Sequence, residues 1–221
     1  MKRKCLVSIV MPFRNAAEFI EEAVESVLTQ TYADFELIAI DDGSTDSSAD
    51  IVENFKDERI KLHRRHHDFI GNLNFGIYTA RGEYIARFDA DDMMHPKRLE
   101  IQLAQMDTDV CFTHMELFGA ETGRVGDVSG VIKRPLALLK IGNPFFHPTM
   151  MARKEMYLPY KRGYDYAEDY KLWCDMAMAG RTFQVIPEVL HRYRVHKGNA
   201  FMAHTIEQMK LTSKIMAELC E

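Results

Sequence analysis

The sequence predicts an α/β fold in which helices flank a central, mostly parallel sheet. Apolar segments of strand length alternate with amphipathic helical segments from the start of the chain to residue 92, the order typical of β-α-β units. Those strand segments are continuously apolar and rich in branched side chains, as expected for strands buried on both faces. With 221 residues, 47% of them hydrophobic and 28% charged, the chain can bury one large core. It contains no linker, repeat or low-complexity segment, so we expect a single domain over residues 1–221.

The elements of the first half follow one another in a regular order. Residues 4–12 are a continuous apolar run that ends at a proline, and they predict the first strand. Asn15 is expected to cap the next helix, in which Ile20, Val24 and Val27 repeat at the spacing of one buried face. The same criteria predict strands at 35–40, 60–63 and 83–88, a helix around 51–55 and a helix over 72–80.

The second half is less regular. Pro96 stands at a favoured first helical position and predicts a helix that runs to about Met106. Residues 119–134 carry four glycines and little periodicity, which indicates a loop or hairpin able to close over a ligand. Gly180 is expected to end a helix. The elements expected in this half are strands at 110–118, 149–152, 183–186 and 189–195, and helices at 136–141, 167–179 and 206–219.

Charge, cysteine spacing and missing motifs exclude several classes of function. Asp and Glu number 33 against 28 Lys and Arg, a net charge of −5, so the chain lacks the basic field that nucleic-acid binding requires. Neither G-x-G-x-x-G nor G-x-x-x-x-G-K-[ST] follows a strand, which argues against a nicotinamide cofactor or a P-loop ATPase. The four cysteines are widely spaced, and we expect reduced thiols. A long apolar stretch and a signal peptide are both missing, so we expect a cytoplasmic protein.

Two strands of the first half end in acidic clusters. Asp41-Asp42 follows the second strand, and Asp89-Ala-Asp91-Asp92 follows the fourth. In an open parallel sheet both clusters lie at the carboxyl edge, so their carboxylates converge and need a cation to offset their repulsion. Hard oxygen ligands suit Mg2+ or Mn2+, which one or two carboxylates hold together with substrate phosphates. For the first cluster alone, ordinary turn chemistry is the alternative.

A third acidic pair stands at the start of a predicted helix. Glu168 and Asp169 occupy its first turn, and its apolar side carries Leu172, Trp173 and Met176. One interpretation is a favourable interaction with the helix dipole, worth about 0.3–1 kcal/mol. The other interpretation is a general base, which the metal cluster elsewhere in the chain favours.

In this order, the motifs resemble those of the family 2 glycosyltransferases of the bacterial surface-glycan type, over almost the whole chain. The resemblance implies a GT-A fold, the Rossmann-like fold of nucleotide-diphospho-sugar transferases. It also implies a nucleotide-sugar-binding half at 1–106 and an acceptor-binding half at 107–221 that includes the C-terminal helix. The matching segments are Val7–Asn15, Glu25–Thr31, Asp41–Asp46, Gly82–Ile85, Asp89–Asp92, Phe146–Thr149, Ala167–Trp173 and Tyr193–His196.

The resemblance assigns roles to residues on the donor side. Pro12 and Arg14 would flank the nucleotide, and Asp42 would accept a hydrogen bond from the uracil ring. Asp91 would face the ribose and the metal. Asp91 and Asp92 would between them supply the direct metal ligand, with Asp89 alongside.

Further roles fall on the second half of the chain. Asp169 resembles the catalytic base, and His196 would reach the metal or the diphosphate. The residues expected on the acceptor or diphosphate side are His147, Glu168, Trp173 and Arg194. For the two histidines, a purely structural place in the core or on the surface is the alternative.

The implied reaction is an inverting transfer from a nucleotide diphosphate donor, a UDP-sugar above all, assisted by Mn2+ or Mg2+. The acceptor would be a hydroxyl of a glycan or lipid-linked intermediate. With such an acceptor, the protein would associate peripherally with the inner face of the cytoplasmic membrane. Alternatives are a module that binds a nucleotide sugar without turnover and a metal-dependent phosphohydrolase of the haloacid dehalogenase type. In that phosphohydrolase the Asp-x-Asp motif ends the first strand, whereas here it ends the fourth. The basic run at 63–67 is interpreted as a solvated loop, with contact to the diphosphate or an anionic lipid carrier as the alternative.

Overall fold

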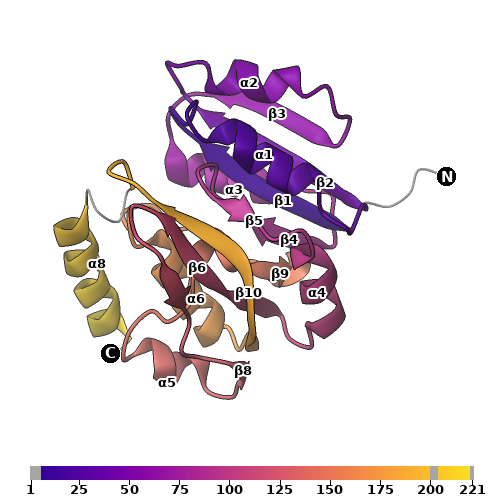
Figure 1. The fold of residues 1–221 in the computed structure, drawn as a ribbon. Helices are drawn as coiled ribbons and strands as arrows, with labels where there is room; N and C mark the ends of the chain where they lie inside the picture. The colour runs from indigo at the N-terminus through magenta and orange to yellow at the C-terminus, as the bar shows by residue number, and fades with distance from the viewer. Residues whose placement is uncertain (1–5, 200–203, 220–221) are drawn as a thin grey trace.

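The computed structural model describes residues 6–199 and 204–219 and confirms the α/β class (Figure 1). The first half alternates strands and helices as expected. Its strands are β1 (Val7–Phe13), β2 (Phe35–Asp42), β3 (Ile60–Arg65) and β4 (Tyr84–Arg87). Its helices are α1 (Ile20–Leu28), α2 (Ser48–Asn54), α3 (Phe69–Thr79) and α4 (Arg98–Gln105), with the two-residue strand β5 (Met93–Met94) before α4.

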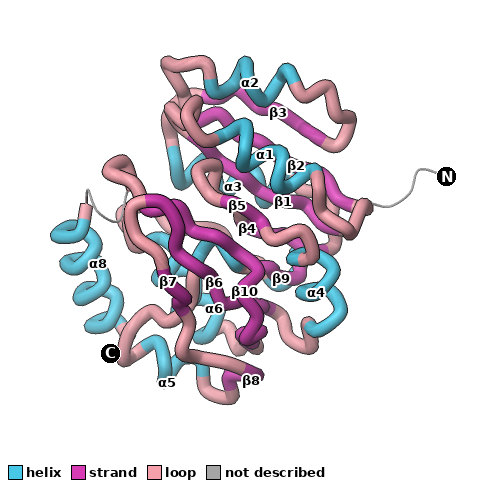
Figure 2. The backbone as a smooth tube through the Cα atoms, viewed as in Figure 1, coloured by secondary structure: helices cyan, strands magenta, loops and turns pink. Residues whose placement is uncertain are grey.

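The second half holds longer strands and more irregular connections. Its strands are β6 (Val110–Gly119), β7 (Gly123–Val125), β8 (Gly130–Ile132), β9 (Met151–Arg153) and β10 (Phe183–Val195). Its helices are α5 (Pro135–Leu139), α6 (Glu168–Met178) and α8 (Thr205–Glu218), with single 3-10 turns at η1 (His147–Thr149) and η2 (Lys154–Met156). Figure 2 shows β7 and β8 as short strands within the glycine-rich segment. Strand β7 forms a hairpin with β6, whereas β8 pairs with β10, so the hairpin alternative for 119–134 holds for the first part of the segment.

The ten described strands form one sheet. Eight of them follow the order β3-β2-β1-β4-β9-β6-β10-β5, while β7 pairs with β6 and β8 pairs with β10 off this path. The long pairings, β3 with β2, β2 with β1, β1 with β4 and β6 with β10, are parallel. Between the two parallel parts lies β9, which pairs antiparallel with β4 on one side and with β6 on the other. The sheet is therefore mixed but mostly parallel, and its parallel strands of the first half end at one edge.

Alternate residues of β1 enter different cores. Ile9 and Met11 are fully buried against α1, whereas Val10 faces the opposite side of the sheet with Ile38 and Ile40. Because side chains alternate across a strand, this pattern places α1 on one face and α3 on the other. A third cluster, in the second half, is built around α6 and includes Trp173 and Phe112. The continuous apolar runs of the sequence are thus explained by a sheet covered on both faces.

Several local predictions were wrong at the level of single residues. Asn15 does not cap α1, which begins at Ile20 without a side-chain cap. Helix α3 begins three residues earlier than expected, because Asp68 caps it by accepting a hydrogen bond from the backbone N–H of Gly71. The two strands expected at 183–186 and 189–195 are one strand, β10, whose register with β6 shifts at the junction.

The described cysteines are free thiols, as expected. Cys111 and Cys174 are buried and free, while Cys5 and Cys220 lie outside the described residues. Within 6–199 and 204–219, none of the helices is long and apolar enough to cross a bilayer.

Candidate functional site

A cleft of about 790 Å3 lies where β1, β2 and β4 end and where α6 begins. It is the place that the open-sheet rule predicts for a ligand. Nine of the expected site residues line it: Pro12, Arg14, Asp42, Asp89, Asp91, His147, Glu168, Asp169 and His196. Asp92, Trp173 and Arg194 do not line it.

Asn15 connects the end of β1 to the turn after β2. Its backbone has a positive φ of 51°, a left-handed conformation that asparagine tolerates. Its backbone N–H donates to the Ser44 hydroxyl at 3.0 Å, and its side-chain oxygen accepts from the backbone N–H of Thr45 at 2.8 Å. Asn15 thus fixes the loop that presents Pro12 and Arg14 to the cleft, a role different from the predicted helix cap.

Asp42 is almost completely buried, and both of its carboxylate oxygens have partners. One oxygen accepts from the backbone N–H of Asp68 at 2.7 Å and from the side-chain amide of Asn72. The other lies 2.8 Å from Nδ1 of His67, whose side chain is 55% exposed. Asp42 therefore holds the start of α3 in place, and His67 is the more accessible polar group at this wall.

His67 is the part of the basic run at 63–67 that lines the cleft. Arg64 forms ion pairs with Asp50 and Glu53 on α2. Arg65 donates to the side chain of Asn72 and lies over the Phe75 ring. These two arginines are engaged within the fold at β3, α2 and α3.

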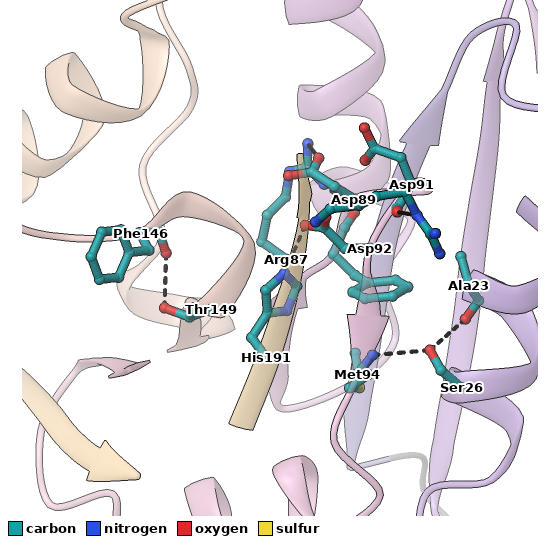
Figure 3. Close-up of polar contacts among 12 residues, drawn as sticks. Ala23, Ser26, Arg87, Asp89, Asp91, Asp92, Met94, Phe146, Thr149 and His191 are labelled. Carbon is teal, nitrogen blue, oxygen red and sulfur yellow. Dashed lines mark hydrogen bonds and ion pairs between the residues drawn. The ribbon is translucent and has the colours of Figure 1, made fainter. Parts of the chain in front are cut away.

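The acidic turn after β4 separates its three carboxylates (Figure 3). Asp89 pairs with the buried guanidinium of Arg87 at 2.6 Å, and Asp91 lies 3.0 Å from Nε2 of His196. Burial raises the pKa of Asp89 even though Arg87 opposes the shift. Asp89 and Asp91 both face the cleft.

Asp92 points the other way, into the protein. Its side chain is fully buried, with one oxygen 2.7 Å from Nε2 of His191 and the other accepting the backbone N–H of Arg194 at 2.8 Å. Burial, followed by the charge of Asp91, raises its pKa well above the ordinary value. Because both oxygens are held by β10, this geometry does not support the prediction of Asp92 as a metal ligand.

The arrangement provides two candidate carboxylates, Asp89 and Asp91, and one imidazole, His196, for a metal. In the part of the chain that the structure describes, no three His, Cys, Asp or Glu side chains converge as a ready metal-binding group. A divalent ion here would need phosphate oxygens from a substrate to complete its coordination, which is how Mg2+ is commonly held.

Glu168 and Asp169 form the acidic start of α6, and both line the cleft. Asp169 accepts the side-chain amide of Asn143 at 3.1 Å and the backbone N–H of Tyr170 at 2.6 Å. Burial raises the pKa of Asp169 to about 6, with these hydrogen bonds opposing the shift. For Glu168, burial and the charge of Asp169 raise the pKa to about 8, and its buried Oε2 has no hydrogen-bond partner among the residues that the structure describes. Of the two, Asp169 is mostly ionised at pH 7, and an ionised carboxylate that lines a cleft is suited to accept a proton.

His147 lies on η1 between the cleft and the second-half core. Its Nε2 is 2.7 Å from the Tyr160 hydroxyl, which in turn is 2.8 Å from the Tyr157 hydroxyl. Burial, with a smaller contribution from the charge of Arg87, lowers the pKa of His147 well below its usual range, so the ring is neutral at pH 7. Trp173 is fully buried, and its ring centroid lies 4.9 Å from that of Phe112 in an edge-to-face arrangement and 5.9 Å from that of His147, so it supports His147 from behind the cleft.

Arg194 acts on the acidic turn from β10. Its Nε donates to the backbone carbonyl of Asp91 at 2.7 Å, and its guanidinium pairs with Glu22 on α1. It also lies over the rings of Phe19 and Phe118. Arg194 is thus positioned to hold the turn, and its contacts differ from the expected place beside a diphosphate.

Some cleft residues were not expected from the sequence. Asp68 lines the cleft and forms a bidentate ion pair with Arg162, with contacts of 2.8 and 2.6 Å. Arg87, Tyr166 and His204 also line it. A charged residue inside the apolar strand before the acidic turn could have indicated Arg87, but no local pattern marks His204, which reaches the cleft from the far end of the chain.

Comparison with known proteins gives consistent results. The family model described as "Glycosyl transferase family 2" matches residues 8–159. An uncharacterized glycosyltransferase of Haemophilus influenzae is 32% identical over 96% of this chain and 72% of its own length. WfaP of Escherichia coli, a UDP-Glc:alpha-D-GlcNAc-diphosphoundecaprenol beta-1,3-glucosyltransferase, is 32% identical over 88% of this chain and 79% of its own length.

Solved structures with the same fold include two complexes with nucleotide sugars. TarS of S. aureus, crystallised with UDP-GlcNAc, superimposes with a TM-score of 0.74 at 18% identity, covering 97% of this chain and 71% of that one. The mannosyltransferase PcManGT of Pyrobaculum calidifontis, in complex with GDP-Man and Mn2+, gives 0.73 at 19% identity, covering 99% of this chain and 65% of that one. At these identities the likeness shows the fold, and the present chain spans about two thirds of the neighbours' lengths.

Proposed function

The chain belongs to glycosyl transferase family 2 and has the GT-A fold, and from that premise we propose that it transfers a sugar from a UDP-sugar to an acceptor hydroxyl with inversion at the anomeric carbon. One observation carries the proposal. A single cleft collects Pro12 and Arg14, the acidic residues Asp89 and Asp91, and the carboxylate of Asp169 at the start of α6. Donor, leaving group and base therefore have places around one cavity.

Residues 1–106 are proposed to form the half of the chain that binds the nucleotide sugar. Pro12 and Arg14 flank the nucleotide, while Asp42 and the more exposed His67 form the wall that meets the base. We propose UDP as the nucleotide because TarS is seen with UDP-GlcNAc and WfaP is named for UDP-Glc. GDP is the competing nucleotide, since PcManGT is seen with GDP-Man.

Asp91 and His196, with Asp89 beside them, are proposed to hold Mn2+ or Mg2+. The fit rests on donor chemistry: two carboxylates and an imidazole face the cleft, and the diphosphate of the donor would supply the remaining ligands. When bound, such an ion stabilises the negative charge that develops on the leaving diphosphate. Asp92 is left out of this set because its oxygens are held by His191 and Arg194.

Asp169 is proposed as the catalytic base. It removes the proton of the acceptor hydroxyl while that oxygen forms a bond to the anomeric carbon, and the bond to the diphosphate breaks on the opposite face. With a pKa of about 6, its carboxylate is mostly ionised at pH 7. A positioned base of this kind contributes about 10²–10⁴-fold to the rate.

The acceptor half is proposed to be residues 107–221, and the acceptor to be a lipid-linked glycan intermediate. The support comes from WfaP, whose name gives a sugar on diphosphoundecaprenol as acceptor. Glu168 and His147 line this side of the cleft. An acceptor on such a carrier would bring the protein to the inner face of the membrane.

The test is Asp169→Asn, with Asp127→Asn on the exposed segment before β8 as the matched control. We expect Asp169→Asn to bind UDP with unchanged affinity and to lose sugar transfer by at least about 10²-fold, because only the proton acceptor is removed. Asp127→Asn should keep both properties. Full transfer by Asp169→Asn would overturn the assignment of the base.

The nucleotide and metal are tested by thermal unfolding of the wild-type protein with UDP, dTDP, GDP or CMP, each with and without Mn2+. A ligand that binds the folded state stabilises it according to its concentration and affinity. We expect the largest rise in Tm with UDP and Mn2+ together. The absence of any rise with all four nucleotides would contradict the proposed function.

A further inference from the structure

Tyr166 is an exposed aromatic residue held in an unusual backbone conformation. Its φ is +73°, a left-handed value that glycine and asparagine adopt readily and that is rare for a bulky side chain. It is 40% exposed and lines the cleft. Strained residues of this kind cluster at ligand-binding sites, where the strain is tolerated because the side chain has a task. The left-handed conformation therefore indicates that the Tyr166 ring contacts a ligand.

His204 supports one face of that ring. The two rings are stacked with centroids 3.9 Å apart and an angle of 14° between their planes. His204 stands immediately before α8, and Gln208 of the same helix also lines the cleft. Helix α8 is in turn packed on the α6 side, where Glu218 pairs with Lys171 at 3.2 Å (Figure 1). With one face covered by His204, the ring is a fixed, flat and partly apolar surface beside the cavity.

The surroundings of this surface identify the class of ligand. Tyr166 is two residues from Glu168 and three from Asp169, and Asp165 also lines the cleft. This acidic wall disfavours a phosphate, while carboxylate and amide oxygens suit the hydroxyl groups of a sugar. The C–H-rich face of a pyranose ring packs well on an aromatic face, and its hydroxyl rim needs polar partners at the edge. The family match ends at residue 159, so the surface lies outside the matched region.

We propose that Tyr166, supported by His204, is a stacking platform for a pyranose ring of the acceptor, with Asp165 and Gln208 available for its hydroxyl groups. The proposal rests on the proposed function, because it places the platform beside the base that activates the acceptor. It adds that residues 204–208, at the start of the last described helix, take part in acceptor recognition. Tyr166 binds the sugar and does not take part in proton transfer.

The test measures binding of simple sugars by saturation-transfer difference NMR, with the methyl glycosides of glucose, galactose, mannose and N-acetylglucosamine as probes. We expect the wild-type protein and Tyr166→Phe to bind at least one glycoside through its ring protons. Tyr166→Ala should weaken that binding about tenfold, the factor that an aromatic stacking contact of ordinary strength supplies. The matched control is Tyr78→Ala, which removes a tyrosine that is 84% exposed on α3 and does not line the cleft.

A second variant separates binding from folding. Tyr166→Gly removes the ring and also relieves the left-handed strain, so its Tm should equal or exceed that of the wild type while glycoside binding falls as in Tyr166→Ala. A residue with only a structural role would instead lower Tm when it is removed.

Three outcomes would overturn the inference. They are failure of the wild-type protein to bind any of the four glycosides, equal glycoside binding by Tyr166→Ala and wild type, and loss of UDP affinity in Tyr166→Ala, which would place the nucleobase on the ring. Measurement of UDP affinity in the wild-type protein keeps the two proposals apart. If UDP does not bind but the glycosides do, the platform stands and the proposed donor chemistry fails.

Discussion

Removal of Asn143 should shift the pH dependence of sugar transfer in a defined direction. The Asn143 amide donates to Asp169 at 3.1 Å, and because a donor stabilises the charged carboxylate, it lowers the pKa of Asp169. A hydrogen bond worth about 0.7–1.4 kcal/mol corresponds to about 0.5–1 pKa unit. In Asn143→Ala the pKa of Asp169 should therefore rise from about 6 to about 6.5–7.

The assay is kcat/KM for transfer between pH 5 and pH 9. Its acid limb reports the base in the free enzyme, and activity rises as the base loses its proton. Relative to wild type, Asn143→Ala should be about two- to fivefold slower at pH 6 and nearly equal at pH 8.5, where both proteins hold Asp169 ionised. Asn143→Asp, which replaces the donor by a negative charge, should shift the limb further in the same direction.

A control variant is Asn54→Ala, at the exposed end of α2, which should leave the limb in place. The reasoning would be refuted by an acid limb that is identical in wild type and Asn143→Ala while both proteins bind UDP equally. That result would mean that another group limits the rate at low pH.

Three further predictions concern stability and metal binding. Burial raises the pKa of Asp169 above its value in the unfolded chain, so its charged form opposes folding, and stability falls as pH rises from about 4 to about 6. Asp169→Asn should accordingly raise the free energy of unfolding at pH 8 by up to about 3 kcal/mol in a urea titration; a loss of stability would contradict this account. Asp91→Ala should abolish the additional rise in Tm that Mn2+ gives with UDP, whereas an unchanged rise would exclude Asp91 as a ligand. His191→Leu leaves the buried carboxyl group of Asp92 without its side-chain partner and should cost about 1–3 kcal/mol of stability, the penalty for an unsatisfied buried polar group, and a cost below about 0.5 kcal/mol would show that this hydrogen bond matters little.

The sequence predicted the parts of the molecule that depend on local pattern. The strands of the first half could be predicted because buried parallel strands are apolar along their length. The acidic turn after β4 stood out because three aspartates within four residues repel one another unless a cation or hydrogen-bond donors offset their charge. The edge at which these strands end then located most of the cleft. Family resemblance supplied the chemistry that these local patterns left open.

Long-range contacts were beyond sequence reasoning. Neighbouring aspartates in one turn look equivalent in sequence, yet Asp91 faces the cleft and Asp92 is buried because β10 brings His191 and a backbone N–H to it from about a hundred residues away. Asn15 looks like a helix cap, but α1 begins five residues later, at Ile20, and the side chain and backbone N–H of Asn15 bond to the turn after β2. The stacking of His204 on Tyr166 likewise joins segments that only the folded chain brings together.

The position of β9 limits how this enzyme can move and how it can diversify. Because β9 is hydrogen-bonded to β4 on one side and to β6 on the other, the two halves share one sheet, and separating them would break backbone hydrogen bonds along its length. Large hinge closure of the kind used by two-domain enzymes is therefore costly here. The acidic turn and the start of α6 would then keep a fixed separation, so the geometry of the proposed reaction would be built into the scaffold. Changes of substrate would then arise in the peripheral segments around Tyr166 and α8, where new side chains can be exchanged without disturbing the reacting groups.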